Sequence, residues 1–143
     1  MSYEYFEHQA DIGIRGKGTT LAEAFEQAAL AMFEIMVEVV KKRPVFQKEE
    51  HKKFLLNKQG NNLEEIFVAW LSELLYLFSS EGLIMDKADM QRLDSNCIQA
   101  EVLGRIFSPD FYRIKTEIKA VTYHELEVKN IQRGYEAQVI FDV

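Results

Sequence analysis

The sequence predicts an α+β protein in which two helices pack on a largely antiparallel sheet. Two stretches have apolar residues at helical spacing, and most of the remaining chain consists of short strand-like runs. Helices and strands do not alternate regularly, as they would in a parallel α/β fold, so antiparallel pairing with helices on one face is expected. The order strand, helix, strand, strand occurs twice, which suggests that one such module is inserted into another.

The first helix is predicted to begin after Thr20, because Thr20 and Glu23 have the spacing of a capping box. Its apolar residues form one stripe: Leu21, Ala24, Phe25, Ala28, Met32, Ile35 and Met36. The second helix is predicted to begin near Asn62 and to end at Gly82, with acids in its first turn where the helix dipole favours them. Its apolar residues cover much of its circumference and predict a core helix: Leu63, Ile66, Phe67, Trp70, Leu71, Leu74, Leu75 and Phe78.

Strands account for most of the remaining chain. Their predicted ranges are 3–7, 12–16, 45–48, 52–57, 83–93, 96–107, 118–128 and 135–143. Turn residues at 94–96 and 130–134 predict two hairpins. The glycines of 15–18 are assigned to a turn into the first helix, because this stretch lacks the Gly-Lys-Ser/Thr ending of a phosphate-binding loop.

Size and composition predict one soluble domain spanning residues 1–143. A chain of 143 residues buries roughly two-thirds of its unfolded surface in a single core. No apolar run approaches the roughly 20 residues of a membrane helix, and the N-terminus lacks the features of a signal peptide. The expected location is therefore the cytoplasm, with no membrane contact.

Charge and cysteine content narrow the function further. A net charge of −6 disfavours a chain that grips nucleic acid by counterion release alone, so either the partner is a protein or another protein holds the nucleic acid. Cys97 is the single cysteine, which excludes an internal disulfide and a Cys-based zinc site. No arrangement typical of a hydrolase is recognisable, so binding is better supported than catalysis.

The two ends of the chain contain candidate metal ligands. The last strand closes with Asp142 and the Val143 carboxyl group, and Asp11 lies between the two strand-like runs at the start. If the ends meet, crowded carboxylates require a cation or several donors nearby. Oxygen ligands select a hard divalent ion, Ca²⁺, Mg²⁺ or Mn²⁺, and His8 or His124 can add a nitrogen ligand or a second donor. The alternative is an ion pair from Lys119 or Arg15 to Asp142.

A second candidate surface is the segment 119–124. Alternation along one extended strand would place Thr122 and His124 on one face and Lys119 on the other. A hydroxyl and an imidazole on one face can contact an anion, a metal-held water or a partner. The alternative is a strand with ordinary polar residues pointing to solvent.

Three segments together resemble the archease family: 5–13 (YFEHQADIG), 117–124 (EIKAVTYH) and 139–143 (VIFDV). The resemblance spans the whole chain and includes the helix around Trp70. Archeases are accessory proteins of the RtcB-type RNA-splicing ligase, which joins RNA ends using GTP and Mn²⁺. The resemblance implies a chain that promotes guanylylation and repeated turnover of that ligase, with RNA contacted only through the ligase.

The resemblance also implies roles for particular residues. Asp11 and Asp142 match the acids that hold a divalent cation in this family, with Ca²⁺ the first expectation. His8, Lys119, Thr122 and His124 become candidates for the functional surface. A role proposed within the family, a chaperone-like adaptor of a tRNA or DNA methyltransferase, is the alternative.

Two departures from the family pattern affect how far these residue roles apply to this chain. Gln9 stands where the family usually has Thr, and Asn61-Asn62 stands where acids are common. A hydroxyl contact and a third carboxylate ligand are therefore absent or replaced by amides.

Overall fold

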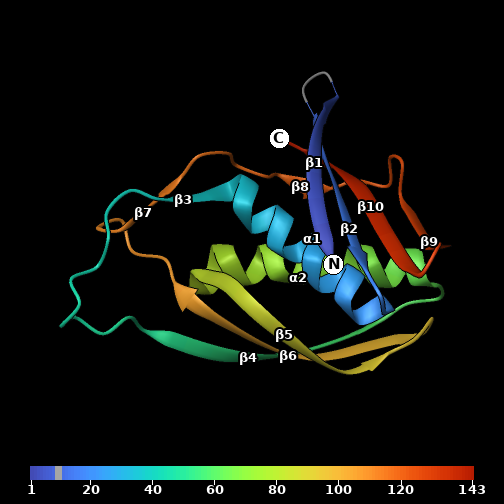
Figure 1. The fold of residues 1–143 in the computed structure, drawn as a ribbon, viewed down its shortest axis with the longest axis horizontal. Helices are drawn as coiled ribbons and strands as arrows, with labels where there is room; N and C mark the ends of the chain where they lie inside the picture. The colour runs from blue at the N-terminus through green and yellow to red at the C-terminus, as the bar shows by residue number, and fades with distance from the viewer. Residues whose placement is uncertain (9–10) are drawn as a thin grey trace.

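The computed structural model describes residues 1–8 and 11–143, with the side chains of 1–6 and 11–143 (Figure 1). Gln9, one of the two departures, lies outside the described residues. The elements in chain order are β1 (Ser2–His8), β2 (Asp11–Gly18), α1 (Leu21–Met36), β3 (Val37–Val39), β4 (His51–Gln59), α2 (Leu63–Glu81), β5 (Leu83–Leu93), β6 (Cys97–Ile106), β7 (Tyr112–Ile114), β8 (Ala120–Val121), β9 (Glu127–Ile131) and β10 (Gly134–Asp142).

Two helices lie between two antiparallel sheets. One sheet has the order β1-β2-β10-β8, with β9 also paired to β10, and the other has the order β4-β6-β5. A short ribbon of β3 and β7 joins them at one end. Figure 1 shows α1 and α2 in the layer between the first sheet and the β4-β6-β5 sheet. The predicted α+β class is confirmed, with the strands divided among three sheets.

The inserted module is also confirmed. β4, α2, β5 and β6 form a strand-helix-strand-strand unit with its own three-stranded sheet. This unit lies in the chain between α1 and the strands β9 and β10, which complete the outer unit begun by β2. The insertion leaves β2 and β10, from opposite ends of the chain, as neighbours at the centre of the first sheet.

The helix α1 packs very closely on β2. Thr20 caps it as predicted, accepting the Glu23 N–H at 3.1 Å. A Cβ atom added at Gly16 would collide with the backbone of Ala24 and Ala28. The assignment of residues 15–18 to a turn is therefore wrong: they belong to β2, and Gly16 is needed because the helix backbone approaches the strand there.

The helix α2 forms the centre of the core. Asn62 accepts the Glu65 N–H at 2.9 Å, and Gly82 ends the helix in a left-handed conformation with φ of 74°. Trp70 is fully buried and donates its indole N–H to the Phe25 carbonyl of α1 at 3.0 Å. One hydrophobic cluster therefore contains residues of both modules. Asn62, the second departure from the family pattern, serves here as a helix cap.

Two predicted strands are wrong. Residues 45–48 form a turn in which the Gln47 N–H donates to the Pro44 carbonyl at 3.0 Å, because the chain leaves the short strand β3 and must reverse direction to reach β4. Residues 118–128 do not form one strand: β8 ends at Val121, and β9 begins at Glu127. Between them the chain turns at Glu125, which has a φ of 51°.

Candidate metal site at the ends of the chain

Asp11 and Asp142 lie directly opposite one another on neighbouring strands. β2 and β10 pair antiparallel over eight residue pairs, from Tyr135 with Gly18 to Asp142 with Asp11. Side chains of a directly opposed pair project from the same face of a sheet, with Cβ atoms about 4.5–5.5 Å apart. The two ends of the chain therefore meet, and two carboxylates lie together where the central strands β2 and β10 end.

The same row continues into the strands on either side. His8 pairs with Asp11 from β1, and Ala120 pairs with Asp142 from β8. The backbone of His8 is therefore next to the acid pair, while its side chain lies outside the described residues. The Lys119 N–H donates to the Asp142 carbonyl at 2.8 Å, so Lys119 also borders the pair.

An apolar row separates the acid pair from the rest of this face. Phe6, Gly13 and Ile140 are the next residues along β1, β2 and β10 on the side of the sheet away from α1. A Cβ atom at Gly13 would collide with the Phe6 ring, so the ring lies directly over the glycine. Ile140 is only 2% exposed. This row was missed from the sequence, although a Phe opposite a Gly across a hairpin is a recognisable pattern.

Beyond the apolar row, the remaining acids are paired with cations. Arg15 forms an ion pair with Glu4, donates a hydrogen bond to the Gln138 side-chain oxygen at 3.0 Å and lies 3.8 Å from a Glu136 carboxylate oxygen. Glu136 lies 3.7 Å from the Lys17 ammonium and 3.4 Å from that of Lys129. Carboxylates on this face therefore have basic partners, in the manner of an ordinary surface network.

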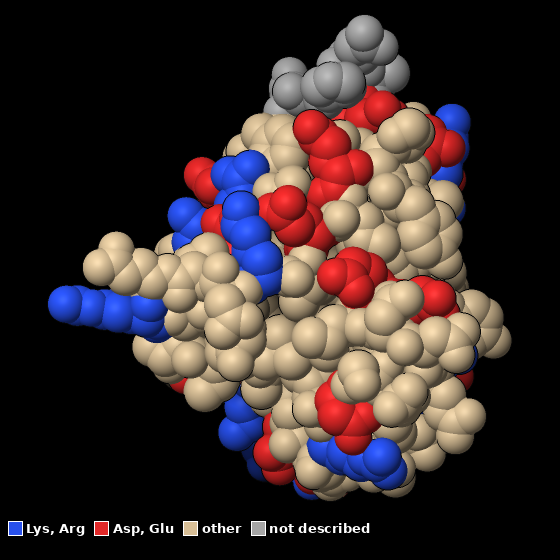
Figure 2. All heavy atoms as spheres, turned by 90° about the vertical axis from the view of Figure 1, so that its right-hand side faces the viewer, with Lys and Arg blue, Asp and Glu red and all other residues tan. Residues whose placement is uncertain are grey.

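No such partner reaches Asp11 or Asp142 among residues 1–6 and 11–143. The expected alternative, an ion pair from Arg15 or Lys119 to Asp142, is therefore not formed between the described side chains. Figure 2 shows Asp and Glu side chains gathered over the upper part of one face of the molecule, with Lys and Arg mostly to one side and below.

We predict that Gly13→Ala lowers stability by about 1–3 kcal/mol, because the added methyl group must displace the Phe6 ring. Urea denaturation measures the change. Phe6→Ala removes the ring that the new methyl group would meet. The double variant should therefore lose less stability than the sum of the losses in the two single variants. Strict additivity would show that the ring does not cover the glycine.

Thr122 and His124 lie in the turn after β8 instead of on one strand. The Thr122 hydroxyl donates to the Ile140 carbonyl at 2.8 Å and accepts the His124 N–H at 3.1 Å. Both bonds hold the turn against β10, so the alternation predicted for 119–124 fails after Val121. The His124 side chain is exposed at this turn, and the Lys119 side chain is exposed beside Asp142.

The donor set suits a hard divalent cation with an open coordination sphere. Two carboxylates face one another, and the main-chain oxygens of Val143 follow Asp142 directly. In the described residues, no group of three or more His, Cys, Asp and Glu side chains gathers closely enough to hold a metal. Ca²⁺ takes six to eight oxygen ligands, so water or a partner must supply several of them.

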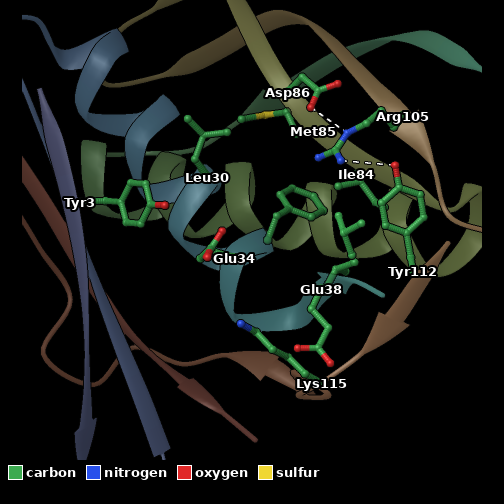
Figure 3. Close-up of a pocket in the computed structure, with 13 residues that line it drawn as sticks. Tyr3, Leu30, Glu34, Glu38, Ile84, Met85, Asp86, Arg105, Tyr112 and Lys115 are labelled. Carbon is green, nitrogen blue, oxygen red and sulfur yellow. Dashed lines mark hydrogen bonds and ion pairs between the residues drawn. The ribbon is translucent and has the colours of Figure 1, made fainter. Parts of the chain in front are cut away.

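A cavity beside the N-terminal strand is separate from this site. A cavity of about 400 Å³ lies between Tyr3 of β1, α1, β5 and Tyr112 of β7, and Asp11 and Asp142 do not line it (Figure 3). The acid pair therefore lies outside this cavity, at the ends of the central strands β2 and β10.

Comparison with known proteins shows the family of this chain. A family model described as the Archease protein family (MTH1598/TM1083) matches residues 3–143. The chain belongs to the archease family. It is 38% identical over 145 residues to the protein archease of Pyrococcus furiosus, covering 99% of this chain and 98% of the relative. The protein archease of Methanosarcina mazei is also 38% identical, with 99% and 95% covered.

Solved structures agree on the archease fold. The solution structure of Methanobacterium thermoautotrophicum protein 1598 superposes with a TM-score of 0.74 at 28% identity, covering 99% of both chains. A Thermotoga maritima crystal structure described as an archease, possible chaperone, superposes with a TM-score of 0.60 at 21% identity, covering 98% of this chain and 96% of that one. Neither α1 nor α2 has the length and hydropathy of a membrane-spanning segment.

Proposed function

We propose that this archease is a metal-binding accessory factor that activates an RtcB-type RNA ligase and is not itself a catalyst. The observation that carries the proposal is the acid pair of Asp11 and Asp142, which face one another at the end of β2 and β10. Like charges directly opposite one another destabilise a sheet, so such a pair needs a compensating charge. A divalent cation supplies that charge where no basic side chain of the described residues does.

The cation would be held by both carboxylates, with the Val143 main-chain oxygens as further donors. Ca²⁺ is the first choice because it accepts irregular oxygen geometry, and Mg²⁺ or Mn²⁺ would retain more water. The open part of the coordination sphere would face the partner. An atom of the ligase, or a phosphate oxygen in the ligase complex, can complete the coordination sphere. Metal binding and partner binding would then be linked.

The partner-facing surface would surround the cation. His8 and Ala120 flank the acid pair in the row across the sheet, and Lys119 borders it through its bond to Asp142. The Lys119 and His124 side chains are exposed and would contact the ligase, while the hydrogen bond from Thr122 to Ile140 holds their segment against β10. RNA would be held by the ligase, since the net charge of −6 does not favour direct binding.

The test is multiple-turnover RNA joining by a purified RtcB-type ligase with GTP and Mn²⁺. We expect the wild-type chain to raise turnover, and we expect Asp11→Asn and Asp142→Asn to lose most of that stimulation. Guanylylation of the ligase, followed with labelled GTP, should decline in parallel. Both variants keep the size and hydrogen-bonding shape of the side chain and remove its charge.

Asp89→Asn is the matched control, because Asp89 also faces an acid, Glu101, across a strand pair. Its neighbour Glu101 lies 3.9 Å from the Lys53 ammonium, so that pair already has a basic partner. Full stimulation by both folded Asn variants of the acid pair would overturn the proposal. Affinity capture that returns a methyltransferase in place of a ligase would favour the adaptor role instead.

A further inference from the structure

The loop between β3 and β4 presents an apolar tip, which we define as Val45 and Phe46. The turn from Pro44 to Gln47 projects both side chains outward: Val45 is fully exposed and Phe46 is 89% exposed. Val39 and Val40, at the start of the same loop, are also exposed. Adjacent large apolar side chains left in water at one loop indicate an interaction surface.

The start of this loop is held in place. The Arg43 guanidinium carbon lies 4.0 Å from the centroid of the Phe111 ring, a cation–π distance. Its Nε atom is 3.7 Å from a Glu49 carboxylate oxygen, which connects the two sides of the loop. The Val40 N–H donates to the Phe111 carbonyl at 2.9 Å.

The end of the loop is also held in place by side-chain hydrogen bonds. The Tyr112 hydroxyl donates to the Glu49 carboxylate at 2.7 Å, and burial, together with this bond, raises the pKa of Tyr112 so that the hydroxyl keeps its proton. Arg105 donates to the Tyr112 hydroxyl at 3.3 Å and to Asp86 at 2.9 Å (Figure 3). The apolar tip is thus carried on an ordered base, which lowers the entropy lost when it binds.

A groove lined mainly by apolar side chains, like the apolar tip, lies near the C-terminal end of α2. Its volume is about 500 Å³, and its apolar lining consists mainly of Met36, Leu75, Phe78, Phe107 and Ile118. Glu81 and Glu117 line it as well. Neither acid has an ion pair within the described part of the chain, so the groove combines apolar walls with uncompensated negative charge.

Charge favours the groove as the receptor of the tip. Lys41, Lys42 and Lys48 flank the tip, and none of them has an ion pair with a described residue. A basic apolar tip complements an apolar groove with acids on its walls. The net charge of −6 would oppose approach of the whole chain to an anionic membrane or to nucleic acid.

The tip and the groove lie at the same end of the molecule. Ile114 of β7 lines the groove and pairs with Val37 of β3, the strand that leads into the loop. In Figure 1 the loop, the β3–β7 ribbon and the end of α2 are all on the left. A two-fold axis at this end would bring each tip to the groove of the other copy, which makes the contact self-complementary.

We propose that this chain forms a two-fold symmetric dimer in which the Val45–Phe46 tip of each copy enters the α2 groove of the other. Neither Asp11 nor Asp142 lines this groove, so dimerisation and cation binding use different residues.

Sedimentation velocity over about 1 μM to 1 mM tests the proposal, a range that spans weak to moderate association. We expect the wild-type mass to rise from one chain to two, and we expect Phe46→Asp to remain one chain throughout. Leu55→Asp is the matched control, since Leu55 is 77% exposed on β4 and should dimerise like the wild type. Circular dichroism checks that each variant is folded.

The groove is tested by charge and by cross-linking. Glu81→Lys with Glu117→Lys should raise the dissociation constant at least about tenfold, and Lys41→Glu with Lys42→Glu added should restore dimerisation. A Phe46→Cys chain mixed with a Ser79→Cys chain, both with Cys97→Ser, should form a disulfide-linked dimer, because Ser79 lines the groove.

Four outcomes would overturn the proposal. A wild-type chain that stays monomeric at the highest concentration has no such dimer. A dimer unaffected by Phe46→Asp, or one that never cross-links positions 46 and 79, uses another surface. Binding of the monomer to phosphatidylserine vesicles that is lost in Phe46→Asp would make the tip a membrane contact instead.

Discussion

Calcium is expected to raise the midpoint of thermal unfolding of the wild-type chain, whereas Asp11→Asn and Asp142→Asn should not respond. A ligand that binds only the folded state stabilises it by about 2.7 kcal/mol at a hundredfold excess over its dissociation constant. For a chain of this size, that stabilisation raises the midpoint of thermal unfolding by roughly 9 °C. Differential scanning calorimetry with and without Ca²⁺, Mg²⁺ and Mn²⁺ measures the shift and ranks the ions.

Without metal, neither substitution is expected to lower the stability of the protein. Asp11 and Asp142 are opposed like charges, so removing one charge relieves repulsion and should leave the metal-free protein equally stable or slightly more stable. Calcium should reverse this order, making the wild type the most stable chain. This reversal separates a cation site from a surface where the acids only support the fold.

Asp89→Asn again provides the control, because its partner across the strands, Glu101, already has Lys53 nearby. Its calcium response should equal that of the wild type. A wild-type midpoint that none of the three ions changes would contradict the metal site, whatever the ligase assay shows.

Trp70→Ala is expected to have the largest effect on stability, about 3–5 kcal/mol. Trp70 is fully buried at the contact between the two helices, and its indole N–H bonds to the Phe25 carbonyl. Its removal opens a cavity in the cluster that contains residues of both modules. Because the total stability of such a domain is about 5–15 kcal/mol, a large part of it would be lost.

Urea denaturation followed by circular dichroism measures this loss, since Trp70 is the only tryptophan and fluorescence would vanish with it. Tyr76→Ala is the control on the same helix, because the Tyr76 side chain is 62% exposed. The free energy of unfolding of this control variant should differ from that of the wild type by no more than about 0.5 kcal/mol. An equal loss in both variants would mean that helix propensity and not core packing determines the result.

Local patterns predicted both helices well. Thr20 caps the first helix as predicted, and the second helix begins after Asn62 and ends at Gly82 as predicted, because capping depends on hydrogen bonds within three or four residues. The predicted hairpin of 83–93 and 96–107 is formed by β5 and β6 for the same reason, since its turn residues and its strands are adjacent in the chain.

Strands that depend on distant partners were predicted less well. β3 and β7 have three residues each and exist only because Val37 and Ile114 meet through the tertiary fold. Residues 118–128 have suitable strand composition, but the bond from Thr122 to Ile140 and the turn at Glu125 interrupt them. Composition does not specify which partner a segment finds, and it therefore misplaces such boundaries.

The sequence by itself determined the α+β class, the caps and the two acids near the chain ends, because these follow from residue types and short spacings. Only the tertiary structure decided that Asp11 and Asp142 stand opposite one another and that Arg15 bonds to Glu4 and Gln138 instead. More than a hundred residues separate the two acids, and their meeting depends on the register of β2 and β10. That register is set by the burial of one face of the sheet against α1, a property of the packed whole.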